Sequence, residues 1–307
     1  MSSITQYLNP EIIAQVNRLD LRARFIVEGF LAGLHRSPFQ GLSVEFSEHR
    51  KYVPGDDLRT IDWNVLARTD RLYVRKYAAE THLDCHIFVD ASASMGHVGN
   101  WSASDADEGG HSAKMSYAIH LAAALGYLIT QQQDAVGLAI LREGLESRLP
   151  PRSRRSDLVH LLSTLAALKP AGRTGLAAGI RDALTCISHR GVVVLLSDLL
   201  TDPAELLNAL HAVRFRGHDL IVMHILDAAE AALAFTGAVR LEDPETGAVI
   251  EVDADEARAR YRRSIDDWRV ELKHRLGAMR ADYLALDTSM PFDKALVEFL
   301  VQRSRRR

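Results

Sequence analysis

Hydrophobic and polar positions after residue 80 alternate between short apolar runs and longer segments with helical spacing. Runs of strand length occur at 82–89, 135–141, 192–196 and 220–226. Segments with helical spacing occur at 113–130, 154–168, 176–188 and 203–215. The run 192–196 contains no polar residue, which is typical of a strand covered on both faces. The alternation predicts an α/β fold with a doubly wound, mostly parallel sheet.

The C-terminal third departs from this alternation. Two short β-prone runs are separated by the turn Asp243-Pro244-Glu245-Thr246-Gly247, which predicts an inserted hairpin over 239–252. A long helix is predicted next from one apolar stripe with steps of three or four, formed by Ala257, Tyr261, Ile265, Trp268, Leu272, Leu276 and Met279. A last strand at Tyr283–Leu286 and a last helix at Lys294–Val301 complete the predicted domain.

The first eighty residues have a different texture. Residues 10–34 have helical spacing behind Pro10, and from 35 to 80 aromatic and β-branched residues mix with Arg and Asp. Within that stretch Leu72–Tyr77 is strand-prone. We therefore predict two parts, an N-terminal helical and β-prone region (1–80) that packs on a main domain (81–307).

Composition narrows the functional classes. Of the 307 residues, 47% are hydrophobic and 25% charged, which is ordinary for a globular protein, and two cysteines exclude a disulfide scaffold. The 37 basic and 40 acidic residues give a net charge of −3, so no basic field predicts nucleic-acid binding. The longest apolar stretch, Leu121–Ile129, has nine residues, whereas a membrane-spanning helix needs about 20. With no signal-peptide pattern, we expect a cytoplasmic protein without a membrane span.

Candidate polar side chains lie in three loops of the predicted main domain. Asp90, Ser92 and Ser94 form a D-x-S-x-S arrangement after the strand ending at Val89, and Asp198 follows the apolar strand 192–196. Thr174 lies in a loop just before a predicted helix. Because the loops after parallel strands gather at one edge of a sheet, these side chains are expected to meet there.

The chemistry of these five side chains predicts a site for a hard metal ion. Two carboxylates and three hydroxyls supply oxygen alone, which favours Mg²⁺, or Mn²⁺ or Ca²⁺, over zinc. Neutral hydroxyls leave the ion incompletely neutralised, so it attracts one more carboxylate, which a partner protein can provide. The competing interpretation is local: Ser92 and Ser94 cap the next helix, Thr174 caps the helix after it, and Asp198 opens a turn.

The set Asp90, Ser92, Ser94, Thr174 and Asp198 resembles the metal-ion-dependent adhesion site of von Willebrand factor A-type domains. Upstream, Arg50-x-Tyr52-x-x-Gly55-Asp56-Asp57-x-Arg59-x-Ile61-Asp62-Trp63, followed by Ala67-Arg68, resembles the signature of the bacterial domain-of-unknown-function family 58. The resemblance implies a von Willebrand factor A-like fold. It further implies a MoxR-type AAA+ ATPase as partner, and a role as an adaptor in the maturation or assembly of client protein complexes, with an acidic client side chain completing the metal shell.

Two segments keep alternative interpretations. His97–Ser112 carries Asp105, Asp107 and Glu108 without Lys or Arg, so it is either a surface loop, a lid, or the source of a carboxylate for the metal. The charged residues of the segment Arg50–Trp63 either fasten the N-terminal region to the sheet domain or form a docking surface.

Enzyme motifs are missing from the sequence. It contains no G-x-G-x-x-G, Walker A, H-E-x-x-H or G-x-S-x-G pattern, so we expect a non-enzymatic binding module. A metal-assisted, phosphoesterase-like hydrolase remains an alternative because Asp90 ends a strand beside the predicted ion. Haloacid-dehalogenase-type phosphatases, however, need a second Asp where this chain has Ser92. A metal-independent scaffold is the other alternative.

Overall fold

The structure of the protein is a computed structural model that describes residues 41–51, 65, 68, 72–81, 84–96 and 113–290. The chain divides into two compact units, Ser37–Leu83 and the remainder. The helices predicted at 10–34 and 294–301, the loop 97–112 and most of the Arg50–Trp63 segment lie outside the described residues. The packing of the N-terminal region on the main domain stays a prediction.

The smaller unit contains an antiparallel pair of strands. Strand β1 (Gly41–Lys51) pairs with β2 (Tyr73–Thr81), in a register that runs from Gly41 opposite Thr81 to Lys51 opposite Tyr73. Two register shifts interrupt the ladder. The sequence pattern indicated the second of these strands but not the first.

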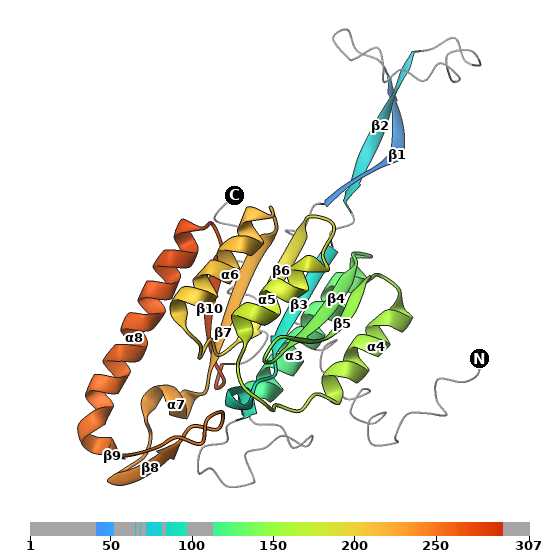
Figure 1. The fold of residues 1–307 in the computed structure, drawn as a ribbon. Coiled ribbons are helices and arrows are strands. Elements are labelled where there is room, and N and C mark those ends of the chain that lie inside the picture. Colours follow the sequence, from blue (N-terminus) through green and yellow to red (C-terminus); the bar gives the residue numbers. More distant parts are fainter. Residues whose placement is uncertain are drawn as a thin grey trace, which may run out of the picture. The chain divides into compact units, whose positions relative to one another are not determined.

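Among the described residues, the larger unit is built on a six-stranded sheet (Figure 1). In spatial order its strands are β10 (Asp282–Asp287), β7 (Asp219–Leu226), β6 (Gly191–Ser197), β3 (Asp84–Asp90), β4 (Val136–Leu141) and β5 (Leu145–Arg152). Neighbours from β10 to β4 are parallel, and β5 is antiparallel to β4 at the edge. The predicted class, α/β with a doubly wound and mostly parallel sheet, is therefore confirmed.

The edge strand β5 was not predicted. Its sequence contains two prolines and two arginines, and its residues are exposed or half-buried. Proline is tolerated in an edge strand because one side of that strand needs no ladder hydrogen bonds. Hydrophobic patterning finds the buried strands and misses one of this kind.

Helices cover both faces of the sheet. They are α3 (Ala113–Gln131), α4 (Arg155–Ala166), α5 (Leu176–Thr185), α6 (Pro203–Phe215) and α8 (Ala254–Ala278). Helices α5 and α6 and the C-terminal half of α8 pack against side chains such as Phe88, Leu195 and Val222 in one core cluster. Helix α3, with α4 beside it, contacts β3, β4, β6 and β7 from the other face. None of the described helices has the length and apolar character that a membrane span requires.

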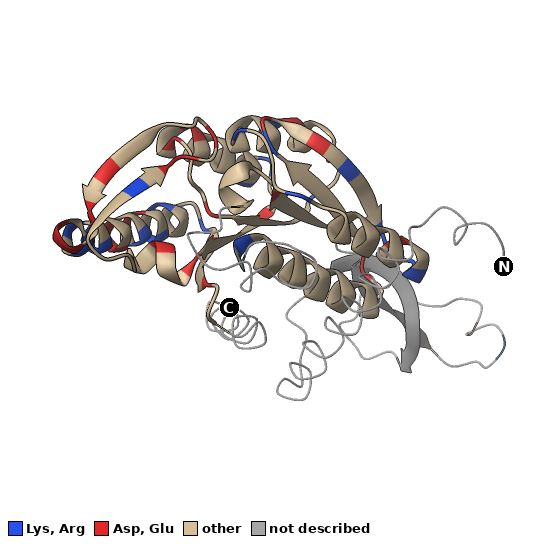
Figure 2. Cartoon of the chain, turned by 90° about the horizontal axis from the view of Figure 1, so that it is seen from below, with Lys and Arg blue, Asp and Glu red and all other residues tan. Residues whose placement is uncertain are grey.

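The carboxyl ends of the parallel strands lie at the lower edge of the sheet in Figure 1. A short 3-10 helix, η2 (Ala93–Gly96), and helix α7 (Ala228–Ala232) follow β3 and β7 there. Strands β8 (Ala238–Glu242) and β9 (Val249–Asp253) form an antiparallel hairpin that spans the segment 239–252. Figure 2 looks towards this edge and shows basic and acidic residues interspersed along α8.

Helix α8 offers a direct test of the core. Leu276 is fully buried in the cluster beneath α8, whereas Val270 on the same helix is 67% exposed. We expect Leu276→Ala to lower the free energy of unfolding by about 2–5 kcal/mol, because it removes buried contacts and leaves a cavity. The matched control Val270→Ala should change it by about 0.5 kcal/mol or less. Urea unfolding measures both, and equal effects would contradict this packing.

Candidate metal centre

Asp90 ends the central strand β3 and is almost completely buried. Its Oδ1 accepts hydrogen bonds from the Ser92 backbone N–H (3.0 Å) and the Ser92 hydroxyl (2.7 Å). Its Oδ2 accepts a hydrogen bond from the Ser197 hydroxyl at 2.6 Å, across the pairing of β3 with β6. Both carboxylate oxygens of Asp90 therefore have donors from protein side chains.

Asp198 brings the end of β6 into the same cluster. The Ser92 and Ser94 hydroxyl oxygens are 3.0 Å apart, and the Ser94 hydroxyl donates to Asp198 Oδ1 at 3.3 Å. All four side chains, Asp90, Ser92, Ser94 and Asp198, are buried. The structure thus joins four of the five predicted residues in one hydrogen-bonded chain.

A buried lysine supplies the positive charge of this cluster. The ammonium group of Lys114, near the start of α3, donates to Asp198 Oδ2 at 3.0 Å and pairs with Glu230 Oε2 at 2.9 Å. Burial by itself would lower the pKa of Lys114, but the neighbouring carboxylates of Asp198 and Glu230 raise it above its ordinary value. Lys114 therefore stays charged and offsets part of the acidic charge around it.

Among the described residues, no Lys or Arg pairs with Asp90 in this way. Burial, and then the negative charge of Asp198, raise the pKa of Asp90 to about 6, although hydrogen bonds from Ser197 and Ser92 favour its charged form. Two buried carboxylates side by side resist full ionisation. The site is accordingly one where an added positive charge is favourable.

Thr174 is positioned by a different contact. Its loop lies against the loop after β3, because Ala171 N–H donates to Ala91 O at 2.9 Å and Ala93 N–H donates to Gly172 O at 3.0 Å. Its side chain and backbone both bind Glu245, from the turn of the β8–β9 hairpin: the Thr174 hydroxyl donates to Glu245 Oε1, and its N–H donates to Oε2 at 2.8 Å.

The residue after Thr174 must be small. An added Cβ at Gly175 would lie 2.1 Å from the carbonyl oxygen of Glu143. That close approach of two backbones holds the Thr174 loop in place. The sequence reasoning did not foresee either this constraint or the bond to Glu245.

The capping interpretation holds only in part. Gly175, not Thr174, is the N-cap of α5, so that part of the local interpretation is wrong. Ser94 lies inside η2 and its hydroxyl is directed to Ser92 and Asp198. Asp198 does open a turn, since its Oδ1 accepts from the Leu200 N–H at 3.3 Å.

These residues fit a hard divalent ion by chemistry and by charge. Every donor atom is oxygen, the ligand type that Mg²⁺ and Ca²⁺ prefer. Within the described residues no group of three or more His, Cys, Asp or Glu side chains is placed to hold a metal ion, so hydroxyl oxygens would have to complete this site. Asp90, Asp198 and Glu230 bring three carboxylates against one ammonium group. Both oxygens of Asp90 and of Asp198 already accept hydrogen bonds, so an ion must compete with Lys114 and the serines.

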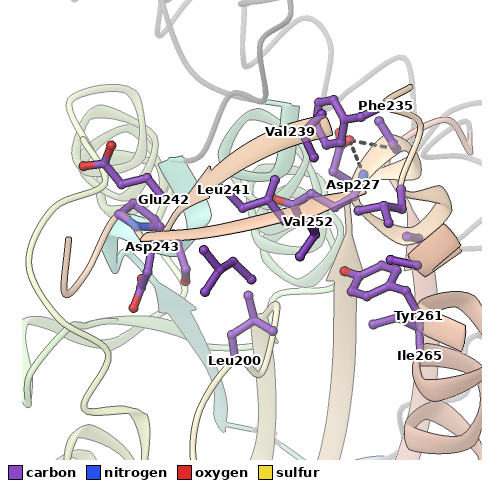
Figure 3. A pocket seen from close by; sticks show the side chains of 18 of the residues that line it. Leu200, Asp227, Phe235, Val239, Leu241, Glu242, Asp243, Val252, Tyr261 and Ile265 are labelled. Atoms are coloured by element: carbon purple, nitrogen blue, oxygen red, sulfur yellow. Dashed lines mark hydrogen bonds between the residues drawn. The ribbon is translucent and has the colours of Figure 1, made fainter. Parts of the chain in front are cut away.

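A cavity of about 1260 Å³ opens beside this cluster. Ser94 and Lys114 are among its lining residues, together with residues of the β8–β9 hairpin. Figure 3 shows Leu241 and Val252 of the hairpin facing the same space as Leu200 and Tyr261. The predicted ion site therefore adjoins a largely apolar hollow.

Four contributing residues were missed by the sequence analysis: Lys114, Ser197, Glu230 and Glu245. Two of them carried a signal. Lys114 is the one Lys, Arg, Asp or Glu in α3, and Ser197 directly precedes Asp198 at a strand end. Glu230, in α7, and Glu245, in the hairpin turn, gave no such indication, because their contacts depend on the tertiary structure.

Comparisons with known proteins agree with the sequence resemblance. The family model described as "Protein of unknown function DUF58" matches residues 48–271. "Uncharacterized protein Rv1480" of Mycobacterium tuberculosis is 30% identical over 301 residues, covering 97% of this chain and 91% of the relative.

Solved structures match at lower similarity. The conserved hypothetical protein BatB of Bacteroides thetaiotaomicron is 15% identical, with a TM-score of 0.46, covering 73% of this chain and 99% of that one. The SpRpn10 VWA domain is 12% identical, with a TM-score of 0.38, covering 72% and 95%. Both TM-scores are below 0.5, so the assignment of the fold rests on the strand order.

The raised pKa of Asp90 has a consequence for stability. A group whose pKa is higher in the folded than in the unfolded protein takes up its proton more readily when folded, so stability rises as pH falls through that interval. In the presence of a chelator, we expect the free energy of unfolding of the wild type to rise, relative to that of Asp90→Asn, as the pH falls from about 6 to 3.8. Urea unfolding across this range, with the exposed Asp182→Asn as control, measures it. Parallel curves for wild type and Asp90→Asn would contradict the expectation.

Lys114 offers a second test. The side chain of Lys114 is 1% exposed and that of Asp198 is 0% exposed, so Lys114→Met leaves a buried carboxylate without its cation. We expect a loss of about 3–5 kcal/mol in the free energy of unfolding, and a smaller loss when Asp198→Asn is added. The exposed Lys169→Met serves as control. Equal losses in the single and double variants would show that the charge pair is not the cause.

Proposed function

The chain belongs to the DUF58 family, and on that premise we propose that it is a non-enzymatic, Mg²⁺-dependent protein-binding adaptor. The observation that carries the proposal is the buried, hydrogen-bonded cluster of Asp90, Ser92, Ser94 and Asp198 at the carboxyl edge of the sheet. Family membership, expected from the Arg50–Trp63 signature and the candidate site, is supported by the match over residues 48–271.

The roles of the residues follow from their contacts. Ser92, Ser94 and Thr174 present hydroxyl oxygens, and Asp90 and Asp198 present carboxylates whose mutual repulsion a cation relieves. Bound Mg²⁺, or Mn²⁺ or Ca²⁺, would supply positive charge that attracts a carboxylate of a partner. Lys114 of α3 holds Asp198 and is itself paired with Glu230 of α7.

The partners belong to the same proposal. The family resemblance suggests a MoxR-type AAA+ ATPase as partner, together with a client protein whose Asp or Glu completes the metal shell. ATP hydrolysis would belong to the ATPase, because this chain has no phosphate-binding motif. The adaptor would act in the maturation or assembly of client complexes.

A second candidate function is a metal-independent scaffold. The observation that favours it is Lys114, whose ammonium already pairs with Asp198 and Glu230. If that ammonium satisfies the cluster, partners would bind the same edge without an ion. The two candidates differ in one measurable property, which is the dependence of binding on divalent metal.

Calorimetric titration of Mg²⁺ and Mn²⁺ into chelator-stripped protein separates these candidates. We expect one saturable site in the wild type, because the cluster carries uncompensated acidic charge, and its loss in Asp90→Ala. The exposed Asp182→Ala should keep the site, and circular dichroism should verify that each variant is folded. Capture of a MoxR-type AAA+ ATPase should follow the same pattern and weaken in chelator.

Two outcomes would overturn the proposal. Capture that is equally strong in chelator and in Asp90→Ala would favour the scaffold. Metal-dependent turnover of phosphate esters that disappears in Asp90→Ala would instead identify the protein as a hydrolase.

A further inference from the structure

The carboxylate of Glu245 is bound to one of the candidate metal ligands. Glu245 is far from Thr174 in sequence, yet its two oxygens accept from the Thr174 hydroxyl and the Thr174 N–H. Because both of its oxygens accept hydrogen bonds from the same residue, the Glu245 carboxylate is fixed in orientation as well as in distance. Glu245 and Ser94 also line the same cavity.

The hairpin turn holds Glu245 in this place by its own hydrogen bonds. Asp243 Oδ1 accepts from the Glu245 N–H at 2.9 Å, and the Asp243 carbonyl accepts from the Gly247 N–H at 2.8 Å. The Asp243 N–H donates to the Ala248 carbonyl at 2.8 Å, which closes the base of the turn. Gly247 has a φ of +69°, a conformation that favours glycine. Glu245 is therefore presented by a closed turn.

The contact leaves the Thr174 oxygen able to act as a ligand. Thr174 donates its hydroxyl hydrogen to Glu245, so the lone pairs of the hydroxyl oxygen remain available to a cation. A cation bound by Thr174 and Ser94 would meet a carboxylate that belongs to the same chain.

We propose that Glu245 is an internal ligand of the metal site, which takes the place of a partner's carboxylate until a partner displaces the β8–β9 hairpin. This inference rests on the proposed metal site and adds to it a regulatory element. The hairpin then acts as a latch, because a carboxylate of the partner competes with Glu245 for the ion. Apolar side chains of the partner that neighbour this carboxylate enter the hollow that Leu241 and Val252 line.

The hairpin would also make the site selective for the kind of partner that can displace Glu245. The rim of the cavity carries Glu242, Asp243 and Glu245 on the hairpin side. Like charges there disfavour a partner carboxylate in the absence of an ion. Displacement of Glu245 should therefore require both the divalent ion and an acidic partner segment.

The test uses Mn²⁺ and acetate as probes. We expect the dissociation constant for Mn²⁺ to rise about tenfold or more in Glu245→Ala, because the ion loses one carboxylate ligand. Glu245→Gln should behave similarly, since it keeps an acceptor for Thr174 but not the charge. Glu242→Ala is the matched control, because Glu242 lies on the same hairpin without a hydrogen bond to Thr174 among those described. Acetate should restore Mn²⁺ affinity in Glu245→Ala and leave the wild type unchanged.

The outcomes separate this inference from the proposed function. If the wild type binds Mn²⁺ and both Glu245 variants bind it equally well, the internal ligand is wrong and the metal site stands. If acetate strengthens Mn²⁺ binding equally in wild type and Glu245→Ala, the carboxylate position is open and the latch is wrong. If neither the wild type nor any variant binds Mn²⁺, both proposals fall.

Discussion

Two buried carboxylates, Asp90 and Asp198, stand at the ends of adjacent parallel strands, and the arrangement around them follows from the cost of placing them together. Their repulsion and burial raise the pKa of Asp90 to about 6. Lys114 neutralises one of them, and hydroxyl and backbone donors occupy the remaining oxygens. Acidic charge is costly in a buried cluster of this kind, and the divalent ion that we propose would offset that cost.

The carboxyl edge combines this charged cluster with an apolar hollow, and the β8–β9 hairpin joins the two. The hairpin contributes Leu241 and Val252 to the hollow and Glu245 to Thr174. The same hairpin thereby covers apolar surface and accepts hydrogen bonds from the loop that contains Thr174. Opening of this element would cost both burial and hydrogen bonding, and the proposed partner would offset that cost by replacing both kinds of contact.

The parts of the fold that could be predicted are those whose burial requires a pattern of apolar residues in the sequence. Runs such as 192–196 indicated strands covered on both faces, and the stripe from Ala257 to Met279 indicated α8, whose residues Leu272 and Leu276 are buried. Strand β5 has no such apolar pattern, because its residues are exposed or half-buried and it pairs with one neighbour. A hydrophobic pattern does not reveal a strand that is defined only by its backbone hydrogen bonds to a neighbouring strand.

The sequence by itself determined the class of the sheet and the placing of Asp90, Ser92, Ser94 and Asp198, because strand order in an open parallel sheet brings the loops after adjacent strands to one edge. It also determined membership of the family, through a signature upstream of the sheet. Only the tertiary structure decided that Lys114 neutralises Asp198 and that Glu245 binds Thr174. Those contacts join residues 84 and 71 positions apart. No local propensity or spacing encodes a pairing at such separation, because the packing of α3 on the sheet and the placement of the hairpin turn beside the Thr174 loop create it.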